Sequence, residues 1–125
     1  MIRKASHFQA GILAAVPRAA RYMTFSIAQP KQVADALSAL ASVADGDEVV
    51  IGVSARLAEQ IGSTIAGLRT FPTFSGAKVE IPATPAALWC WIRGEDRGTI
   101  MHRSRAIEAA TVDAFKADSV VDGFR

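Results

Sequence analysis

The chain has 125 residues, of which 50% are hydrophobic and 21% charged, and its formal net charge is +2. This is the length and composition of one globular domain, not of a disordered chain. The small net charge gives no argument for nucleic-acid binding, and no apolar run approaches the roughly 18 residues of a transmembrane helix. The single cysteine excludes an internal disulfide. We therefore expect a cytoplasmic protein with no nucleic-acid partner and no membrane partner.

The N-terminal residues imitate a signal peptide. Arg3 and Lys4 precede an apolar run over residues 11–16. That run is shorter than the roughly 7–15 apolar residues at the centre of a signal peptide. We interpret residues 1–17 as an extended N-terminal arm and residues 18–125 as one domain.

Changes of hydrophobic period predict the secondary structure. Alternation predicts four strands, at about residues 18–27, 48–54, 87–93 and 118–125. Helical spacing predicts two main helices, at about residues 30–44 and 99–116, and a short helix at 55–61. This order is the ferredoxin-like βαββαβ pattern. We therefore predict an α+β fold in which two helices cover one face of a four-stranded antiparallel sheet, as in dimeric α+β barrels.

The third strand is apolar on both of its faces. Trp89 and Trp91 alternate with Leu88 and Ile92. A sheet face that carries two tryptophans away from the helices needs a cover. A second sheet, another domain or a partner chain could supply it. The alternative is that the segment 62–86, in which residues 77–81 form a short edge strand, folds over the tryptophans.

Five single residues could carry chemistry, and each has a simpler interpretation. Cys90 shares a strand face with apolar residues, so we expect a small core residue and not a redox thiol. His102 lies opposite the apolar stripe of its helix, which predicts exposure to solvent, and we interpret His7 as a surface contact of the arm. Asp118 and Asp122 could be paired acids, but no base accompanies them, and Asp118 fits a turn at the start of the last strand.

A charged cluster surrounds the turn before the second main helix. Arg103 and Arg105, together with Glu95, Asp96 and Arg97, could bind an anion. A solvated, ion-paired surface is the interpretation we favour. The sequence has no Gly-rich phosphate loop and no cluster with metal-ligand spacing. The motifs alone therefore identify no catalytic, cofactor-binding or metal-binding residue.

Several stretches of the sequence nevertheless resemble one enzyme family. They are residues 9–22, 68–72, 81–94, 96–98, 102–105 and 120–125. Together they are similar to the N-terminal half of a bacterial dye-decolourising (DyP-type) haem peroxidase. The resemblance covers nearly the whole chain, and its most specific parts are residues 85–94 and 102–105.

The resemblance implies a structural and assembly domain of a peroxidase. Members of the family have two ferredoxin-like halves and one haem b, and the full-length parent would oxidise dyes or other small aromatic reductants with peroxide. The family's distal aspartate lies in a GxxDG motif, which these residues lack, and its haem-ligating histidine matches neither His7 nor His102. We therefore expect that this chain alone ligates no haem and is no peroxidase. Its expected partner is a second copy or the missing C-terminal half.

Two other functions remain open from the sequence. The chain could be a stand-alone homodimeric α+β barrel without peroxidase activity, whose open sheet face pairs with its own copy. It could also be a nucleic-acid module that stacks bases on Trp89 and Trp91, as RNA-recognition sheets do. The basic-Gly-aromatic signature of those modules is absent, which argues against this third function.

Overall fold

The computed structural model describes residues 8–125, and its main sheet has four strands. These strands are β1 (Ala19–Ile27), β2 (Val49–Val53), β5 (Leu88–Gly94) and β6 (Phe115–Phe124). They lie in the order β2-β5-β1-β6, and every neighbouring pair is antiparallel. This order confirms the ferredoxin-like fold predicted from the sequence.

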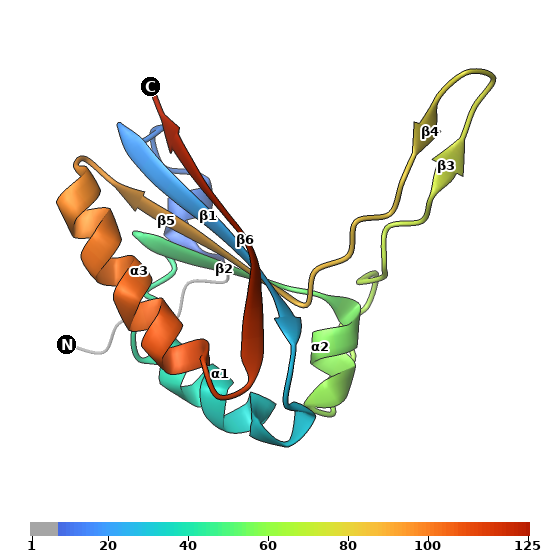
Figure 1. Cartoon of the computed structure of the whole chain (residues 1–125), viewed down its shortest axis with the longest axis horizontal. Helices are drawn as coiled ribbons and strands as arrows, with labels where there is room; N and C mark the ends of the chain where they lie inside the picture. Colours follow the sequence, from blue (N-terminus) through green and yellow to red (C-terminus); the bar gives the residue numbers. More distant parts are fainter. Residues whose placement is uncertain (1–7) are drawn as a thin grey trace.

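Helices line one face of this sheet (Figure 1). A 3-10 turn, η2 (Pro30–Gln32), leads into α1 (Val33–Ala41), and α3 (Arg97–Thr111) precedes β6. The short helix α2 (Ala55–Gln60) follows β2. The two main helices share one face, as predicted. No helix within residues 8–125 is long and apolar enough to cross a membrane.

A proline or a polar capping side chain begins η2, α2 and α3. Pro30 stands at the first position of η2, where its missing N–H costs nothing. Ser54 accepts a hydrogen bond from the backbone N–H of Leu57 at the start of α2, and Asp96 accepts one from Thr99 at the start of α3. These caps satisfy donors that have no partner within the helix.

The core lies between the sheet and the two main helices. Its members alternate along the strands and recur every three or four residues along the helices, and burying each large one contributes about 1.5–3 kcal/mol. They include Met23, Phe25, Val33, Leu40, Leu57, Leu88, Cys90, Ile92, Ile100 and Ile107. Cys90 is fully buried among them, so its predicted core position is confirmed.

The second main helix is shorter than predicted. It ends at Thr111 and not near residue 116, and β6 begins at Phe115, three residues earlier than the predicted strand at 118–125. Ala114 and Phe115 are both buried. In the sequence they follow the spacing of the apolar residues of the helix, which is why the predicted helix included them. The chain turns at residues 112–114, and Phe115 packs edge-on against Phe25 at 6.4 Å between ring centroids.

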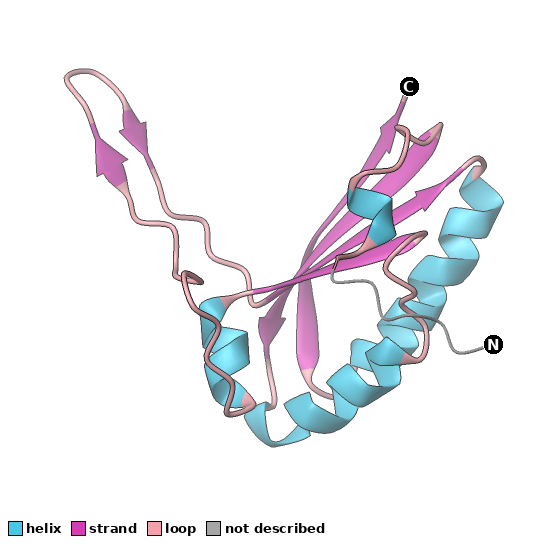
Figure 2. Cartoon of the chain, turned by 180° about the vertical axis from the view of Figure 1, so that it is seen from behind, coloured by secondary structure: helices cyan, strands magenta, loops and turns pink. Residues whose placement is uncertain are grey.

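The segment 62–86 does not fold over the tryptophans. Its strands β3 (Phe74–Ser75) and β4 (Glu80–Ile81) pair only with each other. The prediction of an edge strand of the main sheet at residues 77–81 is therefore wrong. We call residues 69–84 the projecting hairpin, because both views show it extending away from the sheet (Figures 1 and 2). Nearly all of its residues are exposed.

The N-terminal segment packs against the edge of β2 and is not simply extended. Residues Ala10–Ile12 form a 3-10 turn, η1. The side-chain amide of Gln9 donates to the carbonyl of Ile51 at 2.7 Å and accepts from its N–H at 2.8 Å. Gln9 therefore satisfies backbone groups at an edge that would otherwise be open. His7 lies outside the described residues.

Asp45 organises the turn between α1 and β2. Its carboxylate accepts hydrogen bonds from the backbone N–H groups of Asp47, Glu48 and Val49 at 2.9–3.0 Å, and Gly46 takes a positive φ of 76°. Partial burial opposes ionisation of Asp45, but these backbone donors outweigh it and lower its pKa.

Replacing Asp45 tests this turn. We expect Asp45→Ala to lower the free energy of unfolding by about 1 kcal/mol at pH 7, a modest value because the carboxylate is exposed. Since the folded pKa is depressed, the contribution is complete above the unfolded value of about 4 and disappears as pH falls through the folded pKa. Urea unfolding followed by circular dichroism at pH 7 and pH 3 measures it. The exposed Asp113→Ala is the control, and an equal loss in both variants would contradict the assignment.

Candidate functional site

Three aromatic rings cover the sheet face opposite the helices. Tyr22 of β1 packs against both Trp89 and Trp91 of β5, with both ring centroids 6.1 Å away and the planes within 22° of its own. The two tryptophan centroids are 6.2 Å apart. We call these three residues the aromatic layer. Each is only partly buried, so the layer is open to a further partner.

Two glycines leave room for rings of the aromatic layer. A Cβ on Gly52 of β2 would lie 3.2 Å from the ring of Trp89, its cross-strand partner. A Cβ on Gly123 of β6 would lie 3.4 Å from the ring of Tyr22. Aromatic rings that lie close to strand glycines cover exposed backbone.

The N-terminal segment closes one end of this face. Arg93 of β5 lies 4.9 Å from the centre of the Trp91 ring, and one of its terminal nitrogens donates to the carbonyl of Ala15 at 2.5 Å. Gly11 fits closely here, because a Cβ would lie 2.7 Å from Val50 and 2.1 Å from the carbonyl oxygen of Asp47. Arg93 is 7% exposed, and its Nε and the indole nitrogen of Trp91 have no hydrogen-bond partner within residues 8–125. The cation–π contact partly offsets this buried charge.

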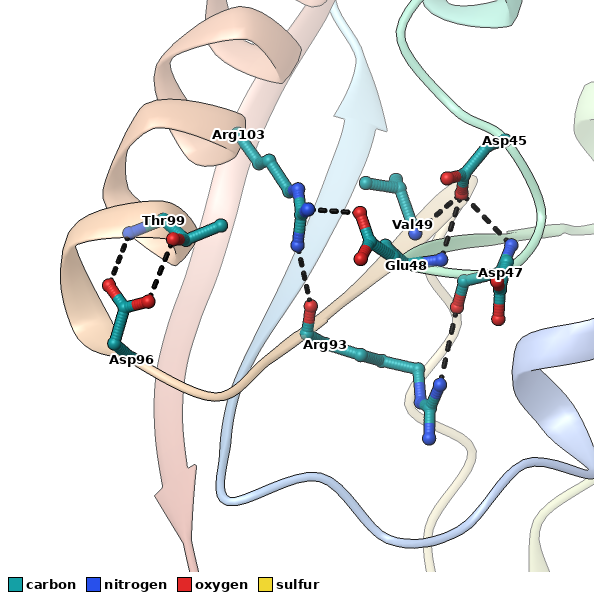
Figure 3. Close-up of polar contacts among 8 residues, drawn as sticks. All are labelled: Asp45, Asp47, Glu48, Val49, Arg93, Asp96, Thr99 and Arg103. Carbon is teal, nitrogen blue, oxygen red and sulfur yellow. Dashed lines mark hydrogen bonds and ion pairs between the residues drawn. The ribbon is translucent and has the colours of Figure 1, made fainter.

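A polar network joins α3 to the turn before β2 (Figure 3). Arg103 forms an ion pair with Glu48 and donates to the carbonyl of Arg93 at 2.9 Å. The carboxylate of Asp96 accepts hydrogen bonds from both the backbone N–H and the hydroxyl of Thr99, and these bonds lower the pKa of Asp96. The carboxylates of Glu48 and Asp96 both have partners in this network, which holds the start of α3 near the turn before β2.

The charged cluster predicted around this turn does not assemble as one site. Arg103 pairs with Glu48 and not with its sequence neighbours, and Arg105 is exposed. Arg97 reaches Asp122 at 3.8 Å, on the opposite side of the helix start. Helix geometry causes this, because residues two apart on a helix point in different directions. The interpretation of a solvated, ion-paired surface therefore fits better than an anion site.

The two predicted acids of β6 have separate partners. Asp122 accepts from Arg21 at 2.7 and 3.2 Å, and this hydrogen bond lowers the pKa of Asp122 and raises that of Arg21. Asp118 accepts from the hydroxyl of Ser26 at 3.1 Å. The prediction that Asp118 lies in a turn is wrong. Phe25 pairs with residue 117 and Thr24 with residue 119, which leaves Asp118 as the extra residue of a β-bulge.

The one histidine and the one cysteine within residues 8–125 do not lie in the same site. His102 is exposed on α3, as predicted. Cys90 lies inside the core, where burial raises the pKa of its thiol to about 12. Within residues 8–125 no three histidine, cysteine, aspartate or glutamate side chains are grouped to hold a metal ion.

Similar folds occur in solved peroxidases, although no protein-family model and no curated protein matches the sequence. A dye-decolourising peroxidase from Bacteroides thetaiotaomicron has a TM-score of 0.77 and 16% identity over 95% of this chain and 44% of its own. The encapsulated DyP-type peroxidase from Mycobacterium smegmatis has a TM-score of 0.75 and 18% identity over 96% of this chain and 43% of its own. A DypB variant from Rhodococcus jostii, solved in complex with haem, has a TM-score of 0.73 and 21% identity over 93% of this chain and 42% of its own.

The chain has the fold of part of a dye-decolourising peroxidase. The resemblance inferred from the sequence is thus confirmed at the level of the fold. The chain spans less than half the length of these peroxidases.

The histidine and the cysteine within residues 8–125 do not fit as axial ligands of haem iron. A ligand of either type has to present a ring nitrogen or a thiolate to the iron from within an apolar pocket. His102, the only histidine in residues 8–125, is exposed on the outer side of α3. The Cys90 thiol is buried in the core and keeps its proton at neutral pH. No catalytic step can be derived for haem from these residues.

Sequence reasoning missed part of the aromatic layer. Trp89 and Trp91 were identified from alternation within one strand, but Tyr22, Arg93 and Gly52 were not connected with them. Arg93 could have been found, because it continues the same alternation two residues after Trp91. Tyr22 and Gly52 depend on the register between strands, for which the sequence carries no local signal.

The buried thiol gives a test of the strand assignment. We expect Cys90 in the native chain to react with an aromatic disulfide reagent at pH 8 at least about 100-fold more slowly than in urea, because only the thiolate reacts. Absorbance of the released thiolate measures the rate. A native rate close to the unfolded rate would show that Cys90 does not face the core.

Proposed function

We propose that this chain is the N-terminal structural and assembly domain of a DyP-type haem peroxidase. The match to the peroxidase fold over 93–96% of this chain, but only 42–44% of the matched proteins, carries the proposal. The parent enzyme would use peroxide to oxidise dyes or other small aromatic reductants, with haem b held by residues outside this chain. The buried lone cysteine fits a reducing compartment, in agreement with a cytoplasmic enzyme.

Two features of the chain support a structural role. Its polar side chains serve caps, turns and ion pairs, such as Asp96 on Thr99 and Arg21 on Asp122. Its aromatic layer is half-buried, and in an assembled protein another polypeptide would cover it. A general acid–base group and a positioned cation, which peroxide chemistry needs, would then come from that other part.

The coding sequence downstream of Arg125 tests the assignment to the family. We expect it to encode a GxxDG motif followed by a histidine and an arginine in the family's order. A downstream reading frame without that motif would contradict the proposal.

The isolated chain tests where the chemistry lies. Mixed with haemin, it is expected to give no Soret spectrum of a histidine-ligated haem and no peroxide-dependent dye oxidation above that of free haemin. His102→Ala is expected to change neither result, because the imidazole points to solvent. The exposed Arg105→Ala on the same helix is the matched control. A stoichiometric haem complex that His102→Ala abolishes and Arg105→Ala preserves would locate an axial ligand in this chain and overturn the proposal.

A further inference from the structure

The projecting hairpin has one apolar face. Phe74 and Ile81 are direct cross-strand partners, so their side chains point to the same side of the hairpin. Val79 precedes Ile81 by two residues, and the ring of Phe71 packs edge-on against that of Phe74 at 5.3 Å between centroids. These four side chains are 51–66% exposed. Exposed apolar residues gathered in this way mark a contact surface more often than scattered ones do.

The rest of the described chain gives the hairpin little support. Each of its strands has two residues and pairs only with the other. A lone two-stranded hairpin is marginally stable in water. At its base, Thr70 and Pro85 share a cleft of about 340 Å³ with Ser26 and Arg56 of the body, so the hairpin does not pack tightly against that body. A contact from outside residues 8–125 would stabilise it.

The hairpin stands on the same side of the sheet as the aromatic layer. The layer is on the face of β5 opposite the core residues Leu88 and Ile92, and therefore opposite the main helices. In both views α3 lies on one side of the sheet and the hairpin on the other (Figures 1 and 2). The returning half of the hairpin leads directly into β5 through Ala87, beside Trp89. A domain that covers the layer would therefore have the hairpin at its side.

The aromatic layer alone offers a small interface. A whole aromatic side chain buries about 150–250 Å², so the partly buried rings and half-exposed Val121, the cross-strand partner of Tyr22, offer roughly 200 Å² of apolar surface. Counted on both partners and with the usual polar share, this gives an interface of about 700 Å². That value is near the bottom of the roughly 600–1,500 Å² found between domains of one chain.

The hairpin more than doubles the apolar area. Phe71 and Phe74, together with Val79 and Ile81, offer about 300 Å². A partner that contacts the layer and the hairpin would form an interface of about 1,700 Å², the size of a stable one. Two hairpins that pair only with each other would bury about 1,000 Å², which is below the roughly 1,200 Å² of stable interfaces. The areas therefore favour one partner on both surfaces over a second copy on the hairpin.

We propose that the hairpin is an arm that holds the domain covering the aromatic layer, and that this domain is the remaining half of the parent peroxidase. The inference rests on the proposed function and adds to it a second, separate contact between the two halves. The solved peroxidases of similar fold have the length for such a domain, because this chain spans only 42–44% of them. The apolar face around Phe74 then lies against residues beyond Arg125 and not against water.

Photo-crosslinking from two positions tests the arm. The experiment uses the full-length protein encoded by the reading frame that continues through Arg125. One variant carries a photo-crosslinking amino acid at position 74 on the hairpin, and another at position 121 beside the layer; both native side chains are exposed in residues 8–125. A crosslinker at Val112, which is 68% exposed after α3, is the control. Denaturing gels separate crosslinks within one copy from those between copies, which double the mass, and mass spectrometry maps them.

We expect positions 74 and 121 both to crosslink, within the same copy, to residues beyond 125, and position 112 not to do so. A charge on the arm should also release it. In the full-length protein, Phe74→Asp should make trypsin cut after exposed Lys78 about 30-fold faster than in the wild type, because loss of a central contact raises the open population by that factor. Val112→Asp is the matched control and should leave this rate unchanged.

The outcomes separate failure of the arm from failure of the proposed function. Crosslinks from position 121 to the second half, with none from position 74 leaving residues 8–125, would overturn the arm and leave the proposed function intact. Crosslinks from position 74 to a second copy would do the same and indicate hairpin pairing. A downstream frame without the GxxDG motif would overturn both. Equal cleavage of Phe74→Asp and the wild type would contradict the arm, and if Phe74→Asp fails to fold, the crosslinks decide alone.

Discussion

The alternation of β5 is the constraint on which the rest of the structure depends. Leu88, Cys90 and Ile92 point toward the helices, so Trp89 and Trp91 have to point the other way. Because β5 pairs with both β1 and β2, its two faces extend across the centre of the sheet. The inner face makes the core that holds α1 and α3. The outer face leaves an apolar layer that these helices cannot reach.

Two glycines on the outer face lie close to aromatic rings. A Cβ on Gly52 would lie 3.2 Å from the Trp89 ring, so a larger residue there would shift that ring, whereas a Cβ on Gly123 would only touch Tyr22 at 3.4 Å. At one end Arg93 lies against Trp91 and holds the N-terminal segment by the carbonyl of Ala15. The polar side chains nearby serve as caps and ion pairs. The polar groups near this face therefore stabilise the fold, and the aromatic layer stays partly exposed.

This division of roles agrees with the similarity to solved peroxidases. The chain matches less than half of each of those proteins, and the part it matches is a sheet with helices on one side only. An antiparallel sheet can leave its other face in water, but that face is then usually polar, whereas here it carries three aromatic rings. The structural role that we propose for this part agrees with the exposed position of His102 and the buried position of Cys90.

The sequence by itself determined the order of the elements, the sheet type and the inward position of Cys90, because these follow from local periods of two and 3.6 residues. It also identified Trp89 and Trp91 as a pair on the face away from the helices. The end of α3 was missed, since Phe115 continues the helical period although it begins β6.

Only the tertiary structure decided which residues meet across strands. The packing of Tyr22 against the two tryptophans, the bulge at Asp118 and the pairing of Arg103 with Glu48 all depend on register between segments far apart in the chain. The direction of the projecting hairpin was likewise undecided by the sequence, because its short strands lack a periodic signal. Register and direction come from packing and long-range hydrogen bonds, which a local pattern does not encode.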